Sequence, residues 1–265
     1  MPHRHWIFSC FVDFILKRVS RFVNTSKVWY HNCRKVKNMN PYLKMLKNPK
    51  MTLIMSLPKN DPALCRAAFE AGADAVKVHI NVEHRASGSR FGRLCEEKAA
   101  LEEMIACAKG PMGLMIGASV ELAAQDAQAA SEMGFDFFSI YAHHMPVGLH
   151  TPRQAWMIAC DGTYSLEEVA AMQRVGAQVL EASIMPGAEY GDPLSLRDVL
   201  RYSALRAHSD LPIVVPSQRA IRPEELTALR DAGMNGVMIG AVVTGQTEES
   251  IRRSIAAFRN AIDRM

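Results

Sequence analysis

The chain has 265 residues, of which 49% are hydrophobic and 22% charged, a composition typical of a globular protein with one large core. Its net charge of +4 is uneven: residues 1–50 hold eleven Lys/Arg and one acid, whereas the remaining twenty Lys/Arg and 26 acids give a net charge of −6. The pI of about 8.7 therefore reflects the first 50 residues and does not indicate nucleic-acid binding. The six cysteines form no CxxC pair and no zinc spacing, so we expect reduced thiols in a cytoplasmic protein.

The first part of the chain does not look like a domain. Residues 6–16, WIFSCFVDFIL, are apolar and flanked by basic residues, but Asp13 interrupts them and they are too short to span a bilayer. No clear cleavage site follows, which disfavours a secretory signal, whereas an amphipathic anchor at a membrane surface stays open. We expect residues 1–38 to be a basic, poorly ordered extension and residues 39–265 to form the domain after a short lead-in.

From residue 52 onward, apolar runs of strand length alternate with amphipathic helical stretches such as PALCRAAFEAG and SLEEVAAMQRVG. Asp61 followed by Pro62 marks the first helix start, whereas the interval 146–154 is too short and too broken for a helix. The predicted strands are 52–58, 75–81, 113–119, 135–143, 155–162, 177–185, 212–218 and 236–243. Eight βα units in series predict an α/β protein with a (βα)₈ TIM barrel and an N-terminal extension; an open doubly wound sheet is the alternative.

A repeated glycine sharpens this prediction. Four helical stretches end in a glycine that leads directly into strand two, four, six or eight: Gly72, Gly134, Gly176 and Gly233. Glycine readily adopts the left-handed conformation that ends a helix. The shared turn gives these strands a common register, so their side chains can be aligned from the glycine onward.

This register predicts which side chains point into the barrel. Alternate strands contribute the members of one interior layer, and alternate residues of a strand point inward. The positions five, seven and nine residues beyond each glycine are Lys77, Ser139, Glu181 and Met238; His79, Tyr141, Ser183 and Gly240; and Asn81, His143, Met185 and Val242. Strands two and six lie across the barrel, so Lys77 and Glu181 should face each other in one layer.

Two interpretations of the Lys77–Glu181 pair are open. It is either a buried ion pair that fills the barrel, or an acid/base pair with coupled pKa values that moves protons. His79 and Tyr141, one layer nearer the mouth, favour the second interpretation, because a structural pair needs no titratable groups above it. Asp161, at the end of the fifth strand, should reach the same mouth. We therefore expect catalytic roles for Lys77, Glu181, His79, Tyr141 and Asp161.

Other residues at this end suit an anionic substrate. The long segment 82–93 carries three arginines, including Arg85, and is typical of a lid or binding loop, although a solvated basic loop is the alternative. Segment 185–193 is a second candidate lid. Gly240 and Ala241, at the end of the last predicted strand, allow close approach of a phosphate to the backbone. The expected substrate- or phosphate-binding residues are Asn81, Arg85, Ser183, Ser217, Arg219, Gly240 and Ala241.

The C-terminal stretch resembles the ribulose-phosphate-binding barrel superfamily over about the last fifty residues. The superfamily pattern is P-x-x-x-x-G-x-I-x-x-x-E-x-x-x-x-L-x-x-x-G-x-x-G-V-x-I-G-S-A. Its counterparts follow in the same order here, at Pro212, Ile221, Glu225, Leu229, Gly233, Val237, Ile239, Gly240 and Ala241. The resemblance implies a TIM barrel that binds a phosphorylated ligand.

Within that superfamily the chain is similar to the N-acetylmannosamine-6-phosphate 2-epimerase family. The shared features are an opening strand with LIMS, a second strand from Gly72 to Asn81, and Arg219 followed by Arg-Pro-Glu. The chain departs from the family in two ways: Ser217-Gln218 replace the carboxylate of strand seven, and strand three has no lysine. If the chain is an epimerase, Lys77 and Glu181 must transfer the proton from different strands.

These observations lead to one preferred function and three alternatives. We expect an isomerase or epimerase of carbohydrate metabolism that transfers a proton next to the carbonyl of a phosphorylated sugar or similar phosphoester. Alternatively, Lys77 forms a Schiff base in a class I aldolase or lyase. A metal site built from His143, His144, Asp161 and Glu189 is disfavoured, because adjacent histidines of a strand cannot both point inward. The last alternative is a non-catalytic barrel that binds a phosphorylated ligand.

The expected partner is a small anionic substrate, with no nucleic acid and no membrane span. No cofactor and no metal are expected, and a homo-oligomer stays open.

Overall fold

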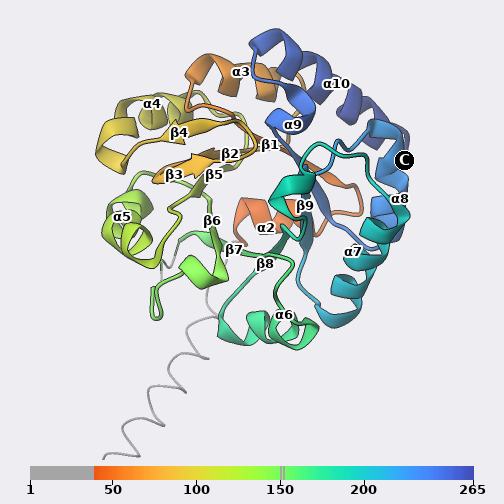
Figure 1. The fold of residues 1–265 in the computed structure, drawn as a ribbon. Coiled ribbons are helices and arrows are strands. Elements are labelled where there is room, and N and C mark those ends of the chain that lie inside the picture. Colours follow the sequence, from red (N-terminus) through yellow and green to blue (C-terminus); the bar gives the residue numbers. More distant parts are fainter. Residues whose placement is uncertain (1–38, 150, 152) are drawn as a thin grey trace, which may run out of the picture. The chain divides into compact units, whose positions relative to one another are not determined.

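The computed structural model describes residues 39–149, 151 and 153–265. The expected extension over residues 1–38 lies outside the described residues. Asn40–Met265 form one compact unit, a closed barrel of parallel strands surrounded by helices (Figure 1). The prediction of a (βα)₈ TIM barrel is confirmed, and closure of the sheet rules out the open doubly wound alternative. In the part of the chain that the structure describes, no helix is long and apolar enough to cross a membrane.

All eight predicted strands form, each within or at one residue of its predicted range. They are β1 (Thr52–Ser56), β2 (Ala75–His79), β5 (Met112–Met115), β6 (Phe137–Tyr141), β7 (Ala155–Cys160), β8 (Val179–Ala182), β9 (Ile213–Pro216) and β10 (Gly236–Ile239). Neighbours follow the order β1-β10-β9-β8-β7-β6-β5-β2, and β1 pairs with both β10 and β2, which closes the barrel.

The helices lie between the strands as expected. They are α2 (Pro41–Leu46), α3 (Pro62–Glu70), α4 (Leu94–Cys107), α5 (Val120–Glu132), α6 (Leu166–Met172), α7 (Leu196–His208), α8 (Leu226–Asp231), α9 (Ala241–Thr244) and α10 (Glu248–Arg264), with short 3₁₀ turns η1 (Ala142–His144), η2 (Gln173–Val175), η3 (Gly187–Glu189) and η4 (Pro223–Glu225). Asp61 caps α3 by accepting a 2.8 Å hydrogen bond from the Ala63 N–H. The described residues of 146–154 contain no helix, as predicted.

The segment 82–93, expected to be an irregular loop, instead contains a β-hairpin. Its strands β3 (Val82–His84) and β4 (Ser89–Phe91) pair antiparallel, with Val82 opposite Phe91. Gly88 provides the left-handed residue of the turn, and Phe91 is buried, which anchors the hairpin to the barrel.

The four glycines of the repeat all adopt the predicted left-handed conformation, with φ values of 106°, 103°, 102° and 89°. Two residues beyond each one, a side-chain oxygen accepts a hydrogen bond from a backbone N–H of the neighbouring odd strand. These bonds, here called the floor clamps, are Leu53 N–H to Asp74 (2.7 Å), Met112 N–H to Asp136 (2.9 Å), Trp156 N–H to Gln178 (3.0 Å) and Ile213 N–H to Asn235 (2.9 Å). The floor clamps fasten each even strand to its neighbour at the base of the barrel.

The lower lumen is packed with apolar side chains. Ile54, Ala75, Phe137, Ala155, Met157, Val179, Val214 and Met238 form an inner core with Tyr42 and Leu46 of α2. Tyr42 stacks on Phe137 with ring centroids 3.8 Å apart, and its hydroxyl donates to the Met157 sulfur at 3.1 Å. The short lead-in before β1 therefore packs against the apolar side chains at the base of the barrel.

Candidate active site

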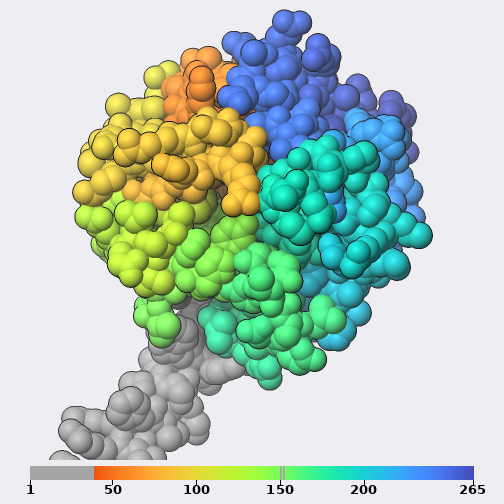
Figure 2. Space-filling model, viewed as in Figure 1, coloured from red at the N-terminus to blue at the C-terminus, as the bar shows by residue number. Residues whose placement is uncertain are grey.

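A pocket of about 930 Å³ opens at the carboxyl ends of the strands. Its walls include all members of the first two predicted interior layers: Lys77, Ser139, Glu181 and Met238, and then His79, Tyr141, Ser183 and Gly240. The glycine register therefore brings to one pocket eight residues that lie in four strands or directly after them. Figure 2 shows the face over this pocket, where the yellow-orange β3–β4 hairpin meets the teal segment after β8.

Lys77 and Glu181 form the predicted ion pair at the bottom of the pocket. The Lys77 Nζ lies 3.3 Å from both carboxylate oxygens of Glu181, and the two residues are only 5% and 6% exposed. The Ser139 hydroxyl donates a 2.7 Å hydrogen bond to Glu181 Oε2. Each charge has partners, which offsets the cost of burial, and both side chains still line the pocket.

Two neutral histidines lie next to this pair. The ring of His79 packs 4.5 Å from His84 and 4.8 Å from Phe91 of the hairpin, measured between centroids. Burial holds the pKa of His79 well below its usual value, and electrostatic repulsion of the protonated ring by His84 and Lys77 lowers it further. Burial and the Lys77 charge lower the pKa of His84 to about 4. His79 Nδ1 is buried without a hydrogen-bond partner among the described residues, and Ser56 Oγ lies 3.5 Å from the other ring nitrogen, Nε2.

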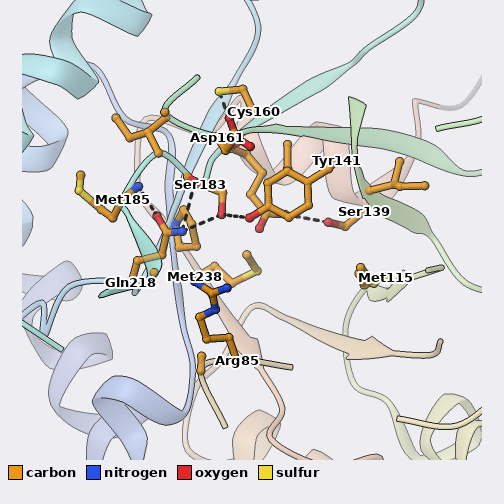
Figure 3. Close-up of a pocket in the computed structure, with 18 of the residues that line it drawn as sticks. Arg85, Met115, Ser139, Tyr141, Cys160, Asp161, Ser183, Met185, Gln218 and Met238 are labelled. Atoms are coloured by element: carbon orange, nitrogen blue, oxygen red, sulfur yellow. Dashed lines mark hydrogen bonds between the residues drawn. The ribbon is translucent and has the colours of Figure 1, made fainter. Parts of the chain in front are cut away.

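Tyr141 belongs to a chain of hydrogen bonds along one wall of the pocket (Figure 3). Its hydroxyl lies 2.6 Å from Ser183 Oγ, and Gln218 Nε2 donates to Ser183 Oγ at 3.0 Å and to the Tyr190 hydroxyl at 2.6 Å. Burial raises the pKa of Tyr141, so its phenol stays protonated and can donate a hydrogen bond.

Asp161 reaches the same pocket from the end of β7. Its carboxylate accepts hydrogen bonds from the backbone N–H and the hydroxyl of Thr163 at 2.9 and 2.6 Å. Partial burial opposes ionisation, but these bonds keep the pKa of Asp161 below its usual value. Asp161 is thus an ionised group held by its own turn.

Part of the expected anion-binding set lies at the mouth. Arg85 lines the pocket and packs over Gly187, where an added Cβ would overlap the guanidinium, so the two predicted lids meet here. The Gly240 N–H donates a 2.8 Å hydrogen bond to Ser217 Oγ, and an added Cβ at Gly240 would lie 3.2 Å from the Ser56 carbonyl. Ala241 begins α9 and does not itself line the pocket.

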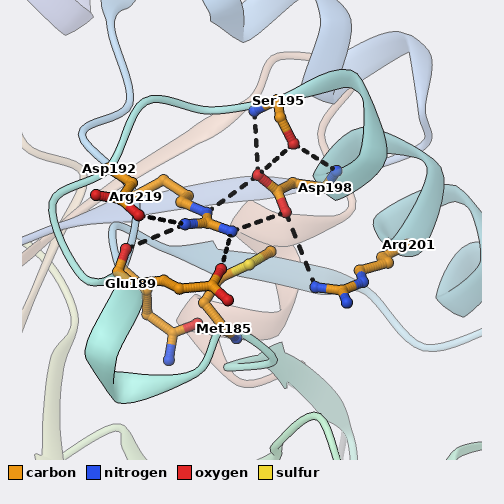
Figure 4. A network of polar contacts seen from close by, with 8 residues as sticks. Met185, Glu189, Asp192, Ser195, Asp198, Arg201 and Arg219 are labelled. Carbon is orange, nitrogen blue, oxygen red and sulfur yellow. Dashed lines mark hydrogen bonds and ion pairs between the residues drawn. The ribbon is translucent and has the colours of Figure 1, made fainter.

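Arg219 does not line the pocket, contrary to expectation (Figure 4). It is buried and forms ion pairs with Glu189 (2.5 Å), Asp192 (3.5 Å) and Asp198 (3.0 Å). Because β9 ends at Pro216, the alternation of a strand no longer governs where Arg219 points. Its guanidinium fastens the segment after β8, the second predicted lid, to the start of α7.

Asn81 also lies outside the pocket. β2 ends at His79, and Asn81 turns into the left-handed conformation with φ 56°. Its amide donates to Asp126 of α5 at 2.8 Å and to the Ile116 carbonyl at 3.3 Å. In the third predicted layer, His143 and Met185 line the pocket, whereas Asn81 and Val242 do not.

The four residues of the metal alternative do not assemble. Glu189 is paired with Arg219, and His143 Nδ1 lies 3.0 Å from the Tyr164 hydroxyl. Over residues 39–149, 151 and 153–265, no group of three His, Cys, Asp or Glu side chains is placed to hold a metal ion.

The predicted site omits many residues that line the pocket, among them His84, Gln218 and Tyr190. His84 lies within the predicted lid 82–93, but an irregular loop gives no reason to point a particular side chain inward. Recognising a hairpin whose first strand starts at Val82 would have placed His84, two residues later, on the same face.

No protein-family model and no curated protein sequence matches the chain. Solved structures resemble it in fold. A thiamine phosphate pyrophosphorylase from Pyrococcus furiosus is 16% identical and superimposes with a TM-score of 0.55 over 83% of this chain and 98% of that one. A tryptophan synthase from Mycobacterium tuberculosis is 17% identical, with a TM-score of 0.63 over 84% of this chain and 96% of that one. At these identities the likeness shows a shared TIM-barrel fold.

Proposed function

We propose that this protein is an enzyme that moves a proton at the carbon next to a carbonyl group in a phosphorylated sugar or similar small phosphoester, as an epimerase or isomerase does. The observation that carries the proposal is the Lys77–Glu181 pair, with Nζ 3.3 Å from both oxygens, at the bottom of an open pocket. A pair kept only for packing would be sealed under apolar side chains, whereas His79 and Tyr141 lie above this one.

The roles follow from the charge and position of each group. The Glu181 carboxylate would take the proton from the substrate carbon, and the Lys77 ammonium would return a proton and stabilise the negative charge that develops meanwhile. Tyr141 remains a phenol and would donate a hydrogen bond to the carbonyl oxygen. Neutral His79, whose ring lines the pocket, would contact the same end of the substrate, and Asp161 would bind a hydroxyl group.

The anionic end of the substrate would lie nearer the mouth. Arg219 is unsuitable, because three carboxylates already surround its guanidinium. Arg85 is the better candidate, together with Ser217, Ser183 and Gly240, which also line the pocket, whereas Ala241 does not. The name of the similar thiamine phosphate pyrophosphorylase supports a phosphorylated ligand in this kind of barrel.

The Schiff-base alternative uses the same lysine differently. Lys77 would have to lose its ion pair with Glu181 before its amine could attack a carbonyl. Borohydride trapping with phosphorylated ketoses, followed by peptide mapping, would detect such an adduct on Lys77. We expect none.

Deuterium exchange tests the proposal and does not require that the product be identified. The protein is incubated in D₂O with a panel of phosphorylated aldoses and ketoses, and proton NMR follows the loss of the C–H signal next to the carbonyl. We expect exchange with wild type and a loss of about 100-fold or more in Lys77→Met. The matched control is Lys98→Met on the exposed side of α4, which should exchange like wild type.

Glu181→Gln provides a second variant that keeps the shape of the side chain and its hydrogen bond with Ser139. It should also abolish exchange while its unfolding stays cooperative. Full exchange in a folded Lys77→Met or Glu181→Gln protein would contradict the proposal.

A further inference from the structure

The pocket does not stop at the barrel lumen. It continues past the end of β8 into a space between α6 and α7, outside the ring of strands. Six residues line this part, here called the α6/α7 lobe: Leu166, Val169, Ile184, Arg201, Ala204 and Leu205. These six residues line the same pocket as Lys77 and Glu181.

The size of the pocket exceeds what the proposed reaction needs. Its 930 Å³ lies near the top of the range of roughly 300–1,000 Å³ that holds drug-sized ligands. A sugar phosphate bound between Lys77 and the mouth would occupy the lumen and leave the α6/α7 lobe empty. The lobe therefore indicates a substrate with a second part.

The chemistry of the lobe defines that second part. Five of its six residues are apolar, and Val169, Ile184 and Leu205 are buried. Such walls favour an apolar group. The half-buried ring of Tyr164, which lines the same pocket near His143, suits a planar group.

Arg201 is the one charged residue of the lobe. Its Nη1 lies 3.9 Å from Asp198, at the limit of an ion pair, and its side chain is 39% exposed. Asp198 is already bonded by Arg219 at 3.0 Å and by the Ser195 hydroxyl at 2.8 Å (Figure 4). The Arg201 guanidinium thus retains most of its donors for an anionic group.

We propose that the α6/α7 lobe is a second ligand subsite, which takes an apolar ring system that carries one anionic group, with the anion at Arg201. This inference rests on the proposed function only in placing the reacting end at Lys77. The substrate is then a two-ended molecule: a phosphorylated, carbonyl-bearing end lies in the lumen, and an apolar end lies between α6 and α7.

Two fluorescent probes of matched shape test the subsite. 1-Anilinonaphthalene-8-sulfonate carries the anionic group, and N-phenyl-1-naphthylamine has the same rings without it. We expect both probes to bind wild type, and the Ala204→Trp substitution, which fills the lobe, to weaken both by about tenfold or more. Arg201→Gln should weaken the sulfonate by about tenfold and leave the neutral probe within twofold, since only the charge-assisted bonds are lost.

Leu200→Trp is the control for the added indole, because Leu200 lies on the same helix but is 62% exposed and outside the pocket. It should bind both probes like wild type. If Ala204→Trp leaves both affinities unchanged, the probes bind elsewhere and the subsite is refuted. If Ala204→Trp does not fold, Arg201→Gln alone tests the proposal. The proposal is overturned if the Arg201→Gln protein binds the sulfonate as tightly as wild type does. It is also overturned if this substitution weakens binding of both probes equally.

The proposed function and the subsite can fail separately. Lys77→Met should bind both probes as wild type does, because Lys77 is not part of the lobe. Probe binding that follows the expected pattern in a protein without deuterium exchange would retain the subsite and refute the proposed reaction. Normal deuterium exchange, with no effect of Ala204→Trp or Arg201→Gln on probe binding, would retain the proposed reaction and refute the subsite.

Discussion

The two ends of this barrel use one repeat in opposite ways. At the floor, the residues two positions beyond the four glycines are Asp74, Asp136, Gln178 and Asn235, and each makes the same bond to its neighbouring strand. Three positions further along, the same strands carry Lys77, Ser139, Glu181 and Met238, which have no common chemistry. The four equivalent hydrogen bonds at the base stabilise the barrel, whereas the four different side chains further along the strands line the pocket, where function resides.

The partners of the polar groups explain the difference. Floor side chains bond backbone N–H groups that every parallel strand offers, so they are satisfied and unavailable to a ligand. At the bottom of the pocket, Lys77, Glu181 and Ser139 bond one another and still line the cavity. A ligand that enters can compete for these bonds.

The largest expected stability effect is at Tyr42 of α2, which packs at the base of the barrel. Tyr42→Ala removes a fully buried ring that stacks on Phe137, so the free energy of unfolding should fall by about 3–5 kcal/mol. Urea unfolding followed by circular dichroism measures it. The matched change at the mouth, Tyr164→Ala, should cost less, because Tyr164 is only half-buried. Similar losses for both tyrosines would break the comparison.

The floor clamps come next. Asp136→Ala leaves the Met112 N–H without its acceptor and should cost about 1–3 kcal/mol, whereas Asp161→Ala at the mouth should stay within about 0.5 kcal/mol. Asp136→Asn should recover much of the loss, because Asn235 forms the equivalent clamp with an amide oxygen. Equal losses for the two alanine variants would show that the floor is not specially stabilised.

A smaller effect concerns pH. The pKa of His84 is lowered to about 4, so its unfolded form binds a proton at higher pH than the folded form. The unfolded state therefore holds more protons between about pH 6.5 and pH 4, and stability should fall as the pH is lowered through that range. In His84→Asn this part of the decline should vanish, as measured by urea unfolding at several pH values. An unchanged pH dependence would mean that His84 is not buried beside Lys77.

The direction of a side chain could be predicted from the sequence inside the strands, where side chains alternate regularly, but not beyond the strand ends. Period-2 alternation located Lys77 and Glu181 across the barrel, because both lie inside strands and a glycine of known conformation fixes their register. Arg219 and Asn81 lie beyond the last residue of their strands, where loop packing decides the direction of a side chain. The expected phosphate ligand Arg219 is instead surrounded by carboxylates that the sequence scatters over residues 189–198.

The sequence does contain a signal for the floor clamps. The residue two positions beyond each repeat glycine is Asp, Gln or Asn, and each of these types has a side-chain oxygen that can accept a hydrogen bond. The position of His84 is harder to predict, because it depends on the β3–β4 hairpin. The three arginines of segment 82–93 suggest a binding loop and not a hairpin.

One measurement tests most directly whether the Lys77–Glu181 pair is kept for chemistry or for stability. The variant Lys77→Met/Ser139→Ala/Glu181→Leu replaces the pair and its hydroxyl donor with apolar groups and leaves no unpaired charge. If the pair serves chemistry, the free energy of unfolding in urea should equal that of wild type within about 1 kcal/mol or exceed it. A loss of several kcal/mol, with the barrel otherwise folded, would show that the pair holds the barrel together and would contradict this account.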